Sequence, residues 1–253
     1  MPNALHALRS SVDRLAALVR PLDDRSLIAQ AYPTEWTIAD VVSHIGSGAV
    51  ISHRRLQATL DDVDPPDDFN QRVWDEWNAK SPRAKVDDGL EADAELTAAL
   101  EETTPGDRAR FKSAMGPLEL DWDAFIGMRL NEHLLHEWDV AVTLDATVPL
   151  AQDGTEVVVD NLELIARFAA KPNGDPRAIR VGTTDPDRSF VVTVEPERVE
   201  FTAAKLGGKP EISMPAESLI RLVYGRLDPM HTPRSVVGER VQLDQLRSVF
   251  PGI

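Results

Sequence analysis

The sequence contains no cysteine among its 253 residues. This absence excludes disulfide bonds, thiolate metal ligands and a cysteine nucleophile, so any thiol chemistry needs a thiol from outside the chain. The sequence also lacks an apolar run of about 18 residues, which excludes a membrane-spanning helix. The first 15 residues, MPNALHALRSSVDRL, carry charges throughout and lack the continuous apolar core of a signal peptide. We therefore expect a cytoplasmic protein without a membrane partner.

Basic residues are scarce. The chain has 27 Lys and Arg against 42 Asp and Glu, a formal net charge of −15. A surface this negative repels phosphate groups, which argues against nucleic acid or an anionic membrane as a partner. The phosphate-binding patterns G-x-G-x-x-G and G-x-x-x-x-G-K-[ST] and the nucleophile elbow G-x-S-x-G are also absent. Small molecules are the expected partners, and we expect a monomer.

Charge and periodicity both change near residue 150. Residues 1–150 hold 14 basic and 27 acidic side chains, a balance of −13, whereas residues 151–253 hold 13 and 15, a balance of −2. Apolar residues recur at helical spacing before this point, and short β-rich runs dominate after it. We therefore predict two domains, residues 1–149 and 150–253.

Four helical stretches are expected in the first domain. Leu5 to Leu18 form an apolar stripe that ends before Pro21, and Thr37 with Asp40 is a capping box for a helix running towards Leu60. The acidic, proline-containing segment 61–68 should be a loop. Further helices are expected over 88–102 and about 120–144. This pattern predicts an all-α four-helix bundle.

The second domain is expected to be a small α+β domain. A helix over 155–170 leads into a Pro- and Gly-containing turn. Strand candidates then follow at 178–182, 189–195, 198–204 and 211–214, and Pro215 opens a helix to Arg226. Residues 236–243 and a short last helix complete the chain.

Two histidines and a glutamate have the spacing of metal ligands. His44 lies on the same helix face as Val41 and Ile51, and Glu132 and His136 are one turn apart on another helix. Two imidazoles and a carboxylate inside a bundle suit a divalent metal with an open position. From spacing alone, a histidine on an apolar helix face is usually a core residue, and a Glu–His pair four residues apart is often a surface hydrogen bond. His133 and His53 are expected at the surface.

Two segments of the sequence support the interpretation of these residues as metal ligands. Residues 35–44, EWTIADVVSH, resemble the "GWTVRDVVAHL" segment of the mycothiol-dependent maleylpyruvate isomerase family. Residues 129–141, RLNEHLLHEWDVA, resemble its "RxxEHxxHxWDxA" segment. The resemblance implies a DinB-like bundle followed by a domain similar to sterol carrier protein type two. It also implies that His44, Glu132 and His136 hold zinc.

The resemblance further implies that the metal activates a small thiol, mycothiol, for addition to an electrophilic substrate. Elimination of the thiol after bond rotation gives cis–trans isomerisation, whereas a thiol that stays attached gives an S-transferase. Arg226 is the candidate partner for a substrate carboxylate, with a helix C-terminal cation as the alternative. Asp139 is the candidate to orient a ligand histidine, with a solvated helix residue as the alternative. Trp36 and Trp138 are expected to be packing residues.

Two other functional classes stay open at this stage. A non-catalytic binding module would hold an apolar ligand or lipid in the second domain. A thiol-independent metal hydrolase would use a metal-bound water and would turn over without any added thiol.

Overall fold

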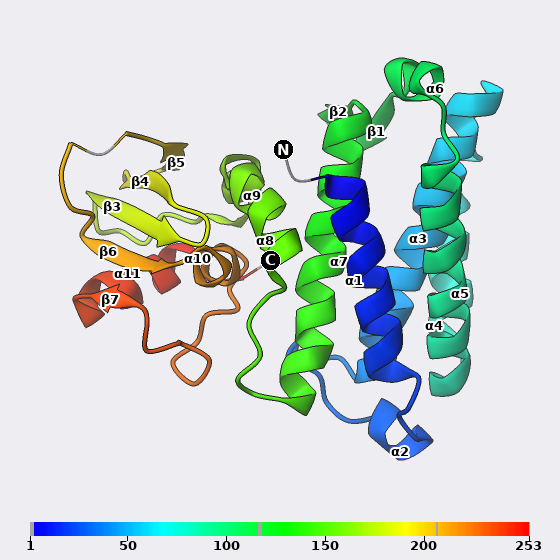
Figure 1. Cartoon of the computed structure of the whole chain (residues 1–253), viewed down its shortest axis with the longest axis horizontal. Coiled ribbons are helices and arrows are strands. Elements are labelled where there is room, and N and C mark those ends of the chain that lie inside the picture. Colours follow the sequence, from blue (N-terminus) through cyan, green and yellow to red (C-terminus); the bar gives the residue numbers. More distant parts are fainter. Residues whose placement is uncertain (1–2, 116–117, 206, 253) are drawn as a thin grey trace. The chain divides into compact units, whose positions relative to one another are not determined.

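The computed structural model describes residues 3–115, 118–205 and 207–252. By its internal contacts the chain divides into two compact units, residues 3–148 and 149–253. The first unit is helical, and the second contains a five-stranded sheet (Figure 1). Across the described ranges, no helix is both long enough and apolar enough to cross a bilayer.

Long helices that contact one another in pairs form the frame of the first unit (Figure 1). α1 contacts α5 and α7, and α3 contacts α5 and α7. These helices are α1 (Ala4–Val19), α3 (Ile38–Asp61), α5 (Pro82–Glu101) and α7 (Trp122–Leu144).

The starts of these helices are fixed by local hydrogen bonds. At α3, the Thr37 side chain accepts from the Asp40 N–H, and the Asp40 carboxylate accepts from the Thr37 N–H, which is the predicted capping box. At α5, Ser81 caps the helix and Pro82 occupies the first turn. The second turn of α3, which carries His44, therefore follows directly from a rigid helix start.

Glycines allow α3 and α5 to approach closely. A Cβ on Gly46 would lie 2.6 Å from the Cα of Gly89 and 2.5 Å from the Trp77 ring. A Cβ on Gly89 would lie 3.0 Å from the carbonyl oxygen of Val42. Only hydrogen fits at these positions, so the distance between the two helices is set by the glycines.

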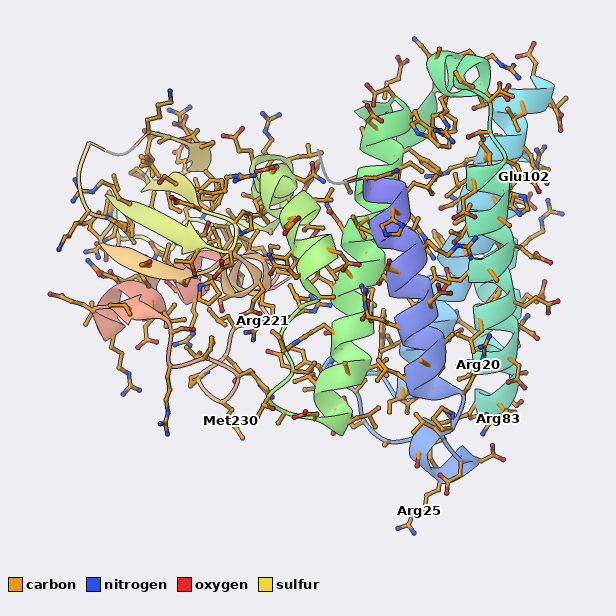
Figure 2. All side chains as sticks on the ribbon, viewed as in Figure 1. Arg20, Arg25, Arg83, Glu102, Arg221 and Met230 are labelled. Atoms are coloured by element: carbon orange, nitrogen blue, oxygen red, sulfur yellow. The ribbon has the colours of Figure 1, made fainter. Side chains whose placement is uncertain are left out.

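Short elements that the sequence analysis did not assign complete the first unit. Arg83 lies in the first turn of α5 (Figure 2). It pairs with Asp24 of α2 at 2.8 Å and donates to the Leu22 carbonyl. The short elements are α2 (Asp24–Leu27), α4 (Phe69–Asn78), α6 (Pro105–Arg110), and the antiparallel pair β1 (Ser113–Met115) and β2 (Leu118–Leu120).

The second unit is built on a mixed sheet with strand order β5-β4-β3-β6-β7. β3, β4 and β5 form an antiparallel meander, and β6 pairs parallel to β3. The strands are β3 (Arg177–Thr184), β4 (Arg188–Val194), β5 (Val199–Ala203), β6 (Ile212–Pro215) and β7 (Val237–Gly238).

Helices of the second unit precede and follow the strands. α10 is buried along nearly its whole length, and Arg221 within it pairs with Glu217 at 2.7 Å (Figure 2). The predicted helix over 155–170 is interrupted by a turn of 3₁₀ helix at Val159–Asn161. The helices are α8 (Gln152–Val158), α9 (Leu162–Ala169), α10 (Ala216–Val223) and α11 (Arg240–Val249).

Candidate metal centre

The structure brings His44, Glu132 and His136 together. His44 projects from the second turn of α3, and Glu132 and His136 project from successive turns of α7. Glu132 Oε2 lies 3.4 Å from His44 Nε2 and 3.8 Å from His136 Nε2. One potential ligand atom of each residue lies within 4.8 Å of the others. Side chains from two helices, 88 residues apart in the sequence, thus converge on one point.

This spacing fits a tetrahedral divalent cation. Metal–ligand bonds of about 2.0–2.1 Å at tetrahedral angles separate neighbouring ligand atoms by about 3.4 Å. The two measured separations to Glu132 lie at or close to that value. Three protein ligands of this type leave the fourth position open, which is typical of catalytic rather than structural zinc sites.

A buried carboxylate orients one of the imidazoles. His136 Nδ1 donates to Asp139 Oδ2 at 2.8 Å, and Asp139 is fully buried. This bond leaves Nε2 of His136 as the acceptor nitrogen facing Glu132. The structure therefore places Asp139 where an orienting partner for His136 is needed.

Glu132 is ionised at neutral pH. Its burial on its own raises the pKa, but the hydrogen bond with His44 and the electrostatic interactions with His136, His44 and Arg129 together lower the pKa to about 2. A carboxylate kept charged between two imidazoles is the donor that a divalent cation requires.

Trp36 covers the two histidines. Its ring centroid lies 5.0 Å from that of His44 and 5.7 Å from that of His136, and the two imidazole centroids are 4.8 Å apart. Trp36 was expected only to pack, and it packs on the site itself. Trp138 donates to the carbonyl oxygen of Val148 and meets Tyr32 edge-on.

Two cavities meet at His44. One, of about 330 Å³, is polar and includes three indole side chains, together with Asp40 and Lys85. The other, of about 300 Å³, lies along α3 and α7 and includes Glu132 and several apolar side chains. Ser47 and Trp74 also border both cavities. The site therefore has room for two small molecules beside the histidine.

Arg226 lies in the second unit, beyond the end of α10. Its Nη1 donates to the carbonyl oxygen of Tyr224 at 3.1 Å. Its backbone N–H donates to the carbonyl oxygen of Arg221. The side-chain contact is of the kind that a cation makes at the end of a helix, whereas the backbone contact is open to any residue there. The role of Arg226 towards a carboxylate stays a prediction.

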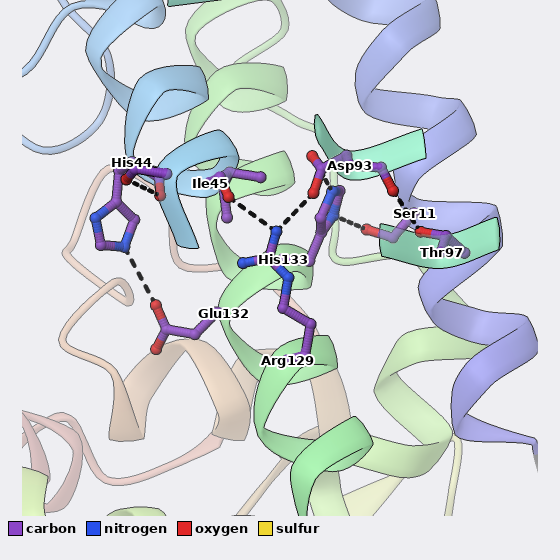
Figure 3. Close-up of polar contacts among 9 residues, drawn as sticks. Ser11, His44, Ile45, Asp93, Thr97, Arg129, Glu132 and His133 are labelled. Carbon is purple, nitrogen blue, oxygen red and sulfur yellow. Dashed lines mark hydrogen bonds and ion pairs between the residues drawn. The ribbon is translucent and has the colours of Figure 1, made fainter. Parts of the chain in front are cut away.

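The expectation for His133 was wrong. His133 is fully buried and lies within hydrogen-bond distance of Ser11 (2.8 Å) and Asp93 (3.2 Å) (Figure 3). Asp93 in turn accepts from Arg129 at 2.6 Å, and Arg129 also donates to the carbonyl oxygen of Ile45 on α3. A polar network therefore links α1, α3, α5 and α7, and its Arg129 lines the same cavity as His44 and Glu132. Asp93 lies between Glu91 and Glu95 in the sequence, so no local pattern distinguishes it from the exposed acidic residues of the same helix.

His53, also expected at the surface, is half-buried and lies 3.5 Å from Gln57 one turn further along α3. It is absent from the ligand cluster, which among the described residues contains His44, Glu132 and His136.

Comparisons with known proteins identify the family. Residues 8–141, just over half of the chain, match the mycothiol maleylpyruvate isomerase N-terminal domain. The chain belongs to this family. The matched range contains all three residues of the cluster, together with Asp139.

Solved structures of the family share the fold. A crystal structure of the mycothiol-dependent maleylpyruvate isomerase superposes with a TM-score of 0.63 at 14% identity and covers 88% of each chain. The structure of its histidine-to-alanine mutant gives the same TM-score and coverage at 13% identity. The search of curated proteins gave no significant match. At this identity, the structural likeness establishes the fold, and substrate and mechanism have to be argued from the residues.

Proposed function

We propose that this chain is a zinc-dependent enzyme that activates mycothiol for addition to an electrophilic small molecule. The observation that carries the proposal is the His44–Glu132–His136 cluster with an open fourth position, in a chain of the mycothiol maleylpyruvate isomerase family. The reaction is either cis–trans isomerisation, as in maleylpyruvate isomerase, or S-transfer of the thiol.

The chain's own residues would hold the reacting groups. His44, Glu132 and His136 are the three ligands, and Asp139 fixes which nitrogen of His136 is available. A divalent cation bound there supplies Lewis acidity, which favours the thiolate form of a coordinated thiol. Trp36 packs against both imidazoles and would restrict their movement. The external thiol agrees with the absence of cysteine from the chain.

The two cavities at His44 support a reaction of two small molecules. A thiol and an electrophile must meet at one point, and each needs a pocket of its own. The polar and the mostly apolar cavity share His44, Ser47 and Trp74, so molecules in the two cavities would meet beside the cluster. Arg226 would pair with a carboxylate of the substrate, as the family resemblance implies.

We also propose finer assignments for the two units. The long helices α1, α3, α5 and α7, with the cluster split between α3 and α7, support a DinB-like four-helix bundle for residues 1–149. The five-stranded sheet with α8 to α11 supports a domain similar to sterol carrier protein type two for residues 150–253.

The first test is the metal content of the purified full chain by mass spectrometry. We expect about one zinc per chain, and a marked loss in His44→Ala and in His136→Ala. His53→Ala is the matched control, because His53 is also on α3 but outside the cluster. A full metal complement in both ligand variants would refute the assignment.

The second test follows the thiol. Titration of mycothiol into the zinc-loaded protein should produce thiolate absorbance at neutral pH, and maleylpyruvate should isomerise only when the thiol is present. Turnover without any thiol would favour a metal hydrolase. A metal-free protein that binds apolar ligands without turnover would favour the binding module.

A further inference from the structure

Arg55 is a half-buried cation without a counter-ion. It lies on α3, 11 residues after His44, and lines the same mostly apolar cavity of about 300 Å³. Within the described ranges its guanidinium makes neither a hydrogen bond nor an ion pair. Its neighbour Arg54, by contrast, donates to the carbonyl oxygen of Val63 at 3.0 Å.

Among the buried and half-buried arginines that the structure describes in this unit, a guanidinium without a polar partner is unusual. Arg20 and Arg25 also lack a partner, but both are exposed. Arg9 pairs with Glu101, Arg14 with Glu137, and Arg129 with Asp93. In a chain with 42 acidic residues, carboxylates are plentiful. Arg55 therefore lacks a carboxylate partner at the position where its side chain lines the cavity.

Burial makes Arg55 ready to accept an anion. Loss of solvent lowers the pKa of Arg55, although a guanidinium stays charged at any physiological pH. A charge that has already lost part of its water gains more from an ionic partner than a fully hydrated one does. Asp62 and Asp64 line a neighbouring hollow that Arg55 also borders, but no carboxylate oxygen of either lies within 4 Å of it.

The cavity connects Arg55 to the cluster. Eleven residues correspond to three helical turns, so His44 and Arg55 lie on one face of α3, about 16 Å apart along the axis. Glu132 lines the cavity from α7 together with Phe125 and Met128, and Trp74 lines it from α4. The wall between the two polar ends is therefore largely apolar and aromatic.

We propose that Arg55 binds the carboxylate of a substrate whose apolar body lies in this cavity and whose reactive end reaches the His44–Glu132–His136 cluster. The assignment of the molecule as substrate rests on the proposed function, whereas its binding does not. Arg129 also lines the cavity but is already paired with Asp93, so Arg55 offers the charge that a substrate carboxylate can neutralise. The planar guanidinium matches a carboxylate in two parallel hydrogen bonds. Arg55 is thus a specificity residue distinct from Arg226.

The test measures binding of octanoate and of octanol to the full chain by calorimetry. Octanoate and octanol share the apolar chain and differ in the charged head, so their affinity ratio isolates the contribution of the carboxylate. We expect tighter binding of octanoate, and Arg55→Gln to weaken it about ten-fold or more without changing octanol. Arg55→Lys should restore part of the preference, because the charge is kept and the two-bond geometry is lost.

Arg54→Gln is the matched control and should leave both affinities unchanged. Thermal melting of each variant checks that the fold is intact. Equal binding of octanoate by wild type and Arg55→Gln, or an equal loss in Arg54→Gln, would overturn the proposal. Repeating the binding measurements after treatment with a chelator separates the Arg55 proposal from the proposed zinc-dependent function. The Arg55-dependent preference for octanoate over octanol should persist without metal, even if thiol activation fails.

Discussion

At the residue scale, the candidate centre depends on a side chain that would not itself touch a metal. Asp139 is fully buried and accepts from His136 Nδ1 at 2.8 Å. Its backbone carbonyl accepts from the N–H of Tyr32 and from Thr143 Oγ1, which holds the residue in place from both sides. The imidazole of His136 is therefore held in one orientation before any ligand arrives.

Asp139→Asn tests this role. The amide keeps the shape but can offer its N–H₂ to His136, which favours the wrong tautomer. We expect zinc affinity to fall about 10- to 100-fold, measured by competition with a chromophoric chelator. Asp145→Asn, at the exposed end of the same helix, is the control. Unchanged affinity in Asp139→Asn would mean that the orientation of His136 is set by packing alone.

A second residue-scale prediction concerns the buried polar network that contains Asp93. Asp93 is 1% exposed and pairs with Arg129 at 2.6 Å. Asp93→Asn leaves a buried guanidinium without its carboxylate, and we expect the free energy of unfolding to fall by about 3–5 kcal/mol. Chemical denaturation at neutral pH measures this loss.

The pH dependence of stability follows from the same carboxylate. Burial on its own raises the pKa of Asp93, but the charges of His133 and Arg129 and their hydrogen bonds outweigh it, so the pKa is lowered. The stabilisation that ionised Asp93 contributes is therefore present above its pKa in the unfolded chain. It is lost as pH falls through the lower pKa of Asp93 in the folded chain. Below about pH 5, wild type should lose stability more steeply than Asp93→Asn. If the free energy of unfolding changed with pH in the same way in wild type and in Asp93→Asn, the pKa of Asp93 would not differ between the folded and unfolded chain.

The residues of the site differ in whether their roles could be predicted from the sequence. His44, Glu132 and His136 could be predicted because helical spacing and two family-like segments point to the same three positions. His133 could not, because α7 is buried on almost every side and its apolar periodicity does not separate an inner from an outer face. Arg55 could not either, because the absence of a partner is a property of the fold.

At the element scale, the long helices were predictable and their neighbours were not. The start of α3 followed from Thr37 and Asp40, and the strands β3 to β6 lie within two residues of their predicted bounds at nearly every end. α4 was missed because it buries only Val73 and Trp77, too few apolar residues for a periodic signal. The parallel pairing of β6 with β3 is a long-range choice that no local pattern encodes.

Gly89→Ala tests the close approach of α3 and α5. Alanine favours helix by up to about 1 kcal/mol over glycine. The added Cβ would nevertheless lie 2.8 Å from Val42 Cγ1 and 3.0 Å from the Val42 carbonyl oxygen. We expect a net loss of about 1–3 kcal/mol in the free energy of unfolding. Gly106→Ala, whose Cβ would meet only Thr104 Oγ1 at 3.6 Å, should be neutral or stabilising. A stabilising Gly89→Ala would show that the helices separate at no cost.

At the scale of the whole molecule, expressing one unit alone tests which functions belong to which unit. The cluster, Asp139, Trp36 and both cavities at His44 all lie within residues 3–148. Residues 1–148 expressed alone should therefore fold as a helical unit and bind zinc with the affinity of the full chain, measured by calorimetry and circular dichroism. They should also keep the octanoate preference, because Arg55 belongs to this unit.

Unlike zinc binding, thiol-dependent turnover should depend on the second unit, because Arg226 belongs to residues 149–253. We expect activity to fall in residues 1–148 alone, and Arg226→Gln in the full chain to lower it in the same direction while zinc content stays unchanged. Arg167→Gln, a cation in the last turn of α9, is the control in the second unit. Full activity in residues 1–148 would place the whole reaction in the helical unit. A folded but metal-free helical unit would instead mean that a ligand is contributed from outside it.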